Sequence, residues 1–102
     1  MTKFFVKWRV DLSRSALSPK EAVQLGLKLG DAVKAEMSSG KVAEWGSFCN
    51  GKDGYAIIEG TEQDVSSTMY KYISNVSYEV YPVHGVDDSI AAMKKALEAM
   101  QA

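Results

Sequence analysis

The residues from Phe4 to Val10 alternate at a period of two, and this pattern constrains the fold more than any other feature of the chain. Successive side chains of a strand point to opposite faces, so aromatic and β-branched residues with this spacing predict a strand with one buried side. The apolar face would hold Phe4, Val6, Trp8 and Val10, and the other face Phe5, Lys7 and Arg9.

The rest of the chain carries further strand and helix signals. Ser18, Pro19 and Glu21 predict a capped helix start, and Gly40 its left-handed end. Strands are expected over 42–49, 55–59 and 76–83, with a hairpin at Asn50-Gly51 and Asp53-Gly54. The segment 11–17 is expected to be a loop. Two more helices would be capped by Thr61 and Asp87. The first would bury Val65, Met69, Tyr72 and Ile73. The second has the apolar stripe Ile90, Met93, Leu97 and Met100, and is expected to pack on its own domain or on a partner subunit.

This order of elements predicts an α+β fold of the ferredoxin-like kind. A βαββαβ core would form a four-stranded antiparallel sheet, followed by a C-terminal helix. A length of 102 residues fits a single domain, 1–102. The helices would cover one face of the sheet and leave the other, here called the open face, without a layer.

The hairpin decides which middle-strand residues reach the open face. An even loop puts Tyr55, Ile57 and Glu59 there with Glu44, Gly46 and Phe48, and puts Ala43, Trp45 and Ser47 under the helices with Ala56 and Ile58. An odd loop would move Trp45 to the open face; we expect the even one. The open face would then join the aromatic side chains Phe5, Phe48, Tyr55 and Tyr81 to charged residues, which is typical of an interaction surface. Aromatic residues that simply face water are the alternative.

Several of these segments resemble the dimeric α+β barrel superfamily: the strand from Phe4 to Val10, the Ser18-capped helix, the Trp45-Gly46 strand, the Gly54–Glu59 strand and the short second helix. That superfamily includes muconolactone isomerase-like proteins and cofactor-independent monooxygenases. The resemblance implies a homodimer packed sheet to sheet, with no cofactor. It also implies a pocket for a small organic ligand, either between the sheet and the helices or inside the barrel. No catalytic motif of the superfamily is recognised, so the question whether this chain is an enzyme stays open.

Candidate ligand-binding residues follow from the open face: Phe5, Lys7, Arg9, Glu44, Tyr55, Glu59 and Tyr81. Lys7 and Arg9 point the same way along one strand, and an arginine in such a place binds carboxylates. Glu44 or Glu59 would then act as a base on a carbon acid. In the competing account, Lys7 and Arg9 only neutralise Glu44, Glu59 and Glu79. Assembly without a ligand is the alternative function.

Composition disfavours other classes of function. A net charge of -1 and a pI of about 5.8 argue against binding to duplexes or membrane surfaces. RNA-recognition motifs share this element order and stack bases on aromatic residues of their third strand. Tyr55 is placed for such stacking, but Ile57 occupies the position where these motifs have a second aromatic residue. Cys49 and His84 are single residues of their kind, so no metal site is expected, although a nucleophilic pair between them is conceivable. One cysteine and the lack of a long apolar segment predict a cytoplasmic protein.

Overall fold

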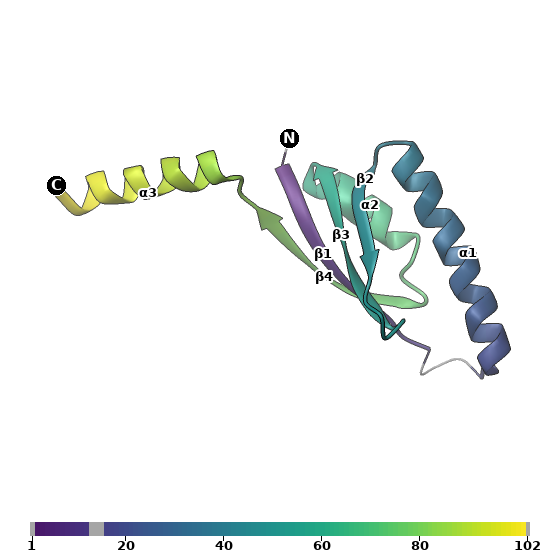
Figure 1. Ribbon diagram of the computed structural model, residues 1–102. Helices are drawn as coiled ribbons and strands as arrows, with labels where there is room; N and C mark the ends of the chain where they lie inside the picture. Colours follow the sequence, from purple (N-terminus) through teal and green to yellow (C-terminus); the bar gives the residue numbers. More distant parts are fainter. Residues whose placement is uncertain (1, 13–15, 102) are drawn as a thin grey trace.

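The computed structural model describes residues 2–12 and 16–101 of the chain, and the middle of the expected 11–17 loop lies outside these ranges. The elements follow the predicted order: β1 (Thr2–Val10), α1 (Pro19–Ser38), β2 (Val42–Ser47), β3 (Asp53–Gly60), α2 (Glu62–Tyr70), β4 (Val76–Val83) and α3 (Val86–Gln101). The fold is therefore α+β, as the sequence predicted (Figure 1).

The four strands form one open sheet in the order β2-β3-β1-β4, and every neighbouring pair is antiparallel. The long strand β1 lies between β3 and β4, with Phe5 opposite Ile57 on one side and Tyr81 on the other. Trp45 pairs with Ala56, so the β2–β3 connection has the even length that we expected. Trp45 therefore lies on the helix side, and Tyr55 on the open face.

One face assignment in β2 is wrong. A β-bulge interrupts the pairing between Val42, which faces Ile58, and Glu44, which faces Ile57. The bulge adds one residue to β2 and shifts the alternation by one position. As a result Val42 is buried in the core, whereas Ala43, which was expected under the helices, is exposed.

The ends of α1 match their sequence signals. Ser18 Oγ accepts a hydrogen bond from the Glu21 backbone N–H, and Glu21 accepts one in return from the Ser18 backbone. At the other end Gly40 adopts a φ of 82°, and the N–H groups of Gly40 and Lys41 bond to the carbonyls of Met37 and Glu36. This is the Schellman arrangement, which satisfies two carbonyls that the helix leaves free.

The helix α2 is shorter than its apolar pattern suggested. Thr61 and Asp64 form a second capping box at its start. Val65 and Met69 are buried as predicted, but the helix ends at Tyr70, and Ile73 is 57% exposed instead of buried. Thr68 takes the buried place instead, and its hydroxyl donates to the carbonyl of Asp64 at 3.0 Å.

The core lies between the sheet and the first two helices. Its buried members on the sheet come from alternate positions of three strands, and α2 supplies two more: Phe4, Val6, Val42, Ala56, Ile58, Val65 and Met69. Trp8 stacks on Trp45 with ring centroids 5.2 Å apart, and its indole N–H donates to the Tyr55 carbonyl. Both helices thus cover the same face of the sheet.

The third helix departs from the rest of the domain. Figure 1 shows α3 leaving the end of β4 and extending away from the sheet and from α1 and α2. It begins at Val86, one residue before the Asp87 that was expected to cap it, and none of its residues is buried. In the described part of the chain, no helix is long and apolar enough to cross a membrane.

Candidate functional site

All seven candidate ligand-binding residues lie on the open face. The strand registers arrange them in rows that run across the sheet. One row holds Glu44, Ile57, Phe5 and Tyr81, and the next holds Gly46, Tyr55, Lys7 and Glu79. Arg9 lies one row further, between Asp53 and Ser77, and Glu59 faces Lys3 near the opposite end of β1. The predicted residues therefore share one surface.

An aromatic pair forms the floor of this surface. The rings of Phe5 and Tyr55 are parallel within 6°, and their centroids are 6.1 Å apart. Gly46 makes this arrangement possible, because a Cβ at this position would lie 2.4 Å from Tyr55 Cε1. Phe48 and Tyr81, which are 46% and 50% exposed, continue the apolar surface toward its edges.

Each glutamate of the open face has a partner of its own. Glu59 lies 3.8 Å from Lys3 Nζ, and Glu79 accepts a hydrogen bond of 2.5 Å from the Tyr81 hydroxyl. That bond raises the pKa of Tyr81 above its ordinary value, because the carboxylate favours the protonated phenol. The pKa of Tyr55 is also raised. Burial of its hydroxyl is the largest cause, and the neighbouring carboxylate of Glu44 adds to it.

The two cations at the centre of the surface are left without these carboxylates. Within the described residues, no ion pair joins Lys7 or Arg9 to Glu44, Glu59 or Glu79. A shallow hollow of about 350 Å³ opens beside them. Open-face side chains around it are Lys7, Arg9, Asp53, Ser77 and Glu79. Lys7 and Arg9 therefore form no direct ion pair with these glutamates, although Glu79 lies opposite Lys7 in the sheet and lines the same hollow.

Besides Glu79, two open-face residues of this hollow were not among the candidate ligand-binding residues. Asp53 belongs to β3 and faces Arg9 on one side, and Ser77 faces it on the other, where its hydroxyl donates to the Arg9 carbonyl. Both follow from the alternation of their strands, since Asp53 is two residues before Tyr55 and Ser77 two before Glu79. The signal was present, but Asp53 was interpreted as part of the hairpin turn.

A second cavity lies on the helix side of the sheet. It has a volume of about 100 Å³ and separates α1 from the strands. Its walls are apolar, and include Val6, Trp8, Val33 and Met69. Burial raises the pKa of Tyr72 at its edge, and the nearby Glu36 adds to this. Among the described residues, no charged side chain lines this cavity, and Thr68 and Tyr72 are the hydroxyl-bearing residues in its wall.

The remaining candidates are not brought together. Cys49 is exposed in the β2–β3 turn, and His84 follows β4. Since the strands are antiparallel and β2 and β4 form opposite edges, these two residues lie at opposite ends and opposite edges of the sheet. A nucleophilic pair between them is excluded. In the described ranges, no three His, Cys, Asp or Glu side chains gather as a metal ion would require.

Comparison with known proteins adds no assignment. No family model matches this chain, and no curated protein matches its sequence. The function must therefore be argued from the site itself.

Proposed function

We propose that this chain is a ferredoxin-like domain of the dimeric α+β barrel type, which pairs through its open face and binds a small organic carboxylate there. The fold is supported by the βαββαβ element order and by an antiparallel sheet with β1 and β3 at its centre. Assignment to that superfamily rests on the resemblance of the sequence and on this architecture.

Pairing through the open face is supported by its apolar content. Phe5, Tyr55 and Ile57 are half-buried with no layer above them, and Phe48 and Tyr81 are exposed. Contiguous apolar surface rimmed by charge is typical of interaction sites on soluble proteins. A second copy would bury this surface and enclose the hollow beside Lys7 and Arg9.

Binding of a carboxylate is carried by one observation: Lys7 and Arg9 point to the same hollow, while the glutamates around them have other partners. A guanidinium forms two parallel hydrogen bonds with a carboxylate, and an ammonium adds a third donor. The Phe5–Tyr55 pair beside them would contact an aromatic or unsaturated ligand. An activity such as isomerisation would then need a base, for which Glu44 beside Tyr55 is the nearest candidate of those that we predicted.

A thermal-shift screen of small carboxylates, followed by calorimetry on each hit, tests the binding proposal. A ligand at about 100 times its Kd stabilises the folded state by about 2.7 kcal/mol, which is readily seen in a melt. Arg9→Met should weaken the hit at least tenfold and leave the oligomer intact. Lys52→Met is the matched control, because it removes a cation in the β2–β3 turn outside the hollow.

Two results would contradict the proposal. If no small carboxylate stabilises the wild-type protein, the ligand-binding proposal is wrong, and assembly is favoured as the function of the open face. An equal loss of affinity in Arg9→Met and Lys52→Met would show non-specific attraction to positive charge. Pairing is tested separately by Phe48→Glu and Tyr55→Glu, which bury a charge in the interface and should split the oligomer in light scattering.

A further inference from the structure

The helix α3 makes the molecule far more extended than a compact domain of its length. The radius of gyration is 17.4 Å and the longest dimension 63 Å, whereas a compact chain of this length has a radius of gyration of about 13 Å. Figure 1 shows the reason, because α3 projects from the end of β4 with nothing beside it. A helix in this position is stabilised only by its own backbone, which is marginal at this length.

The exposed surface shows the same excess. The chain has an accessible surface of 7632 Å², against about 5,700 Å² for a compact monomer of its mass. The difference, about 1,900 Å², is more than the roughly 800 Å² that each partner contributes to a stable interface of standard size. The chain thus has enough surplus surface for more than one contact with a partner.

The apolar residues of α3 form a narrow seam with a heptad spacing. They are separated by four, three, four and three residues: Val86, Ile90, Met93, Leu97 and Met100. All are exposed, from 42% for Ile90 to 80% for Met100. A strict alternation of three and four is the pattern of a helix that packs along another helix, with Ile90 and Leu97 at a positions and the other three at d positions.

We propose that α3 pairs with α3 of a second copy of this chain, in antiparallel orientation about a two-fold axis. A parallel pair would bring two folded domains to the same end of the coil. It would also place the Asp87 and Asp88 pairs of both chains together at one end and align the two helix dipoles. The antiparallel pair sets the domains at opposite ends and opposes the dipoles.

The charges on α3 select one register. When Ile90 lies opposite the partner's Met93, Val86 lies opposite the partner's Leu97, and four apolar layers form. In this register the e position Asp87 faces the partner's Lys94 on both sides of the axis. Sliding the helices by one heptad would instead place Lys94 against the partner's Lys94, which repels. The same register therefore pairs the apolar residues and the opposite charges of two identical helices.

This inference does not rest on the open-face dimer or on ligand binding, because α3 contains no residue of the open face. Light scattering of the full chain tests it with Leu97→Glu, and Lys95→Glu is the matched control at the outward f position of the same helix. Leu97→Glu should weaken the self-association at least tenfold and lower the helix content in circular dichroism, whereas Lys95→Glu should change neither.

The same experiment separates the two interfaces. An unchanged mass in Leu97→Glu overturns the α3 pair, whatever Phe48→Glu does to the open face. A lower helix content in Leu97→Glu at an unchanged mass would also overturn the α3 pair. In that case α3 would depend on contacts within its own chain and not on a second copy. A mass that falls in Leu97→Glu but not in Phe48→Glu supports α3 pairing and removes the open-face dimer.

Charge reversal tests the register. Asp87→Lys should raise the Kd of the pair about threefold to tenfold, since two exposed ion pairs become repulsive. Asp88→Lys also places a positive charge at the helix N-terminus, where it opposes the helix dipole. Because position 88 lies on the side of α3 away from the seam, this variant should raise the Kd less. The double variant Asp87→Lys/Lys94→Asp should recover most of the loss. Equal effects of Asp87→Lys and Asp88→Lys, or no recovery in the double variant, would overturn this register.

Discussion

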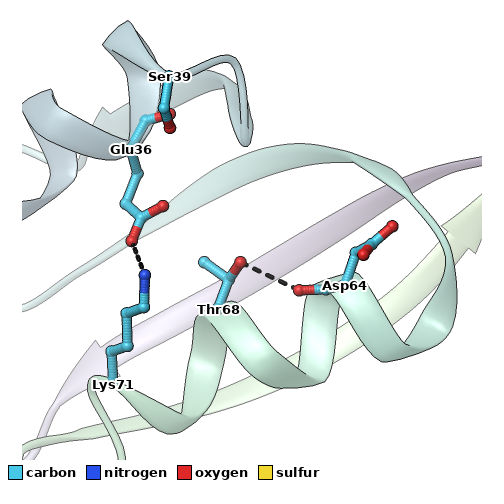
Figure 2. Close-up of polar contacts among 5 residues, drawn as sticks. All are labelled: Glu36, Ser39, Asp64, Thr68 and Lys71. Atoms are coloured by element: carbon cyan, nitrogen blue, oxygen red, sulfur yellow. Dashed lines mark hydrogen bonds and ion pairs between the residues drawn. The ribbon is translucent and has the colours of Figure 1, made fainter.

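Lys71 at the end of α2 donates a hydrogen bond of 2.5 Å to the carboxylate of Glu36 in the last turns of α1. Figure 2 shows Lys71 extending from one helix to the other, beside the Thr68 hydroxyl that caps the carbonyl of Asp64. Glu36 is only 7% exposed. It is the one described residue of α1 that is buried, so this ion pair joins the two helices that cover the sheet.

The pair predicts a loss of stability at high pH. The bond to Glu36 raises the pKa of Lys71 above its ordinary value of 10.5. A group whose pKa is raised in the folded state stabilises it below the unfolded pKa, and this contribution disappears as the pH rises through the folded pKa. We expect Glu36→Gln to melt at a lower temperature than wild type at pH 8, and the difference to shrink above pH 10.5. Asp31→Asn on the exposed side of α1 is the control, and an equal loss in both variants would contradict this account.

The capping box of α2 predicts the opposite dependence. Hydrogen bonds from the Thr61 backbone and side chain lower the pKa of Asp64 below its ordinary value of 3.8. Its contribution is therefore present above that pH and is lost as the pH falls through the lower folded value. Thr61→Ala should cost about 1 kcal/mol at neutral pH. Melts of Asp64→Asn and wild type should differ at pH 7 and converge near pH 2; a constant difference would show that the charge of Asp64 is not what matters.

Short-range patterns predicted much of the fold, because they report local geometry. The alternation in β1 correctly assigned Phe4, Val6 and Trp8 to the core, and the capping residues marked both helix starts. The open-face site was also predictable, since a strand fixes the direction of every second side chain. Lys7 and Arg9 could be placed on one face from their spacing alone.

Other features depend on contacts that no local pattern contains. The bulge at Ala43 leaves the composition of β2 unchanged, so only the pairing with β3 reveals it. The burial of Glu36 follows the spacing of Leu29 and Val33, but its partner Lys71 is 35 residues away. The stripe on α3 showed that this helix has a face to bury, but could not show that its own domain leaves that face uncovered.

Replacing either of two glycines in the middle of α1 by alanine should increase the stability of the protein. Gly26 and Gly30 are helical, and a Cβ built at either position would meet no atom within 4 Å apart from its chain neighbours and the backbone of its own helix. Alanine lowers the entropy of the unfolded chain and should stabilise the protein by about 0.5–1 kcal/mol at each site. Denaturant titrations measure this directly. A loss of stability in Gly26→Ala would mean that another surface approaches this part of α1 closely.

Gly40 should show the reverse behaviour. Its φ of 82° lies in the left-handed region that ends α1. Asparagine tolerates this region, whereas a β-branched side chain clashes with the backbone, so Gly40→Val should cost about 1–2 kcal/mol more than Gly40→Asn. Thermal melts of the two variants give the comparison. Equal melting temperatures would show that the Schellman end of α1 rearranges at no cost.

Alanine should cost different amounts of stability at Gly46, on the open face, and at Gly54, on the helix side of the sheet. A Cβ on Gly54 would lie 2.1 Å from the carbonyl oxygen of Gly46 and 2.5 Å from Trp8 Cζ2. The backbone cannot yield there, so Gly54→Ala should destabilise the protein by about 2–3 kcal/mol. The three atoms nearest to a Cβ on Gly46 all belong to the ring of Tyr55, the closest at 2.4 Å, and that ring can turn toward solvent. Gly46→Ala should therefore cost less in a denaturant titration, yet displace Tyr55 from Phe5 and shift the aromatic NMR signals of both rings. If Gly46→Ala leaves those signals in place, the stacked pair is not positioned by the missing side chain.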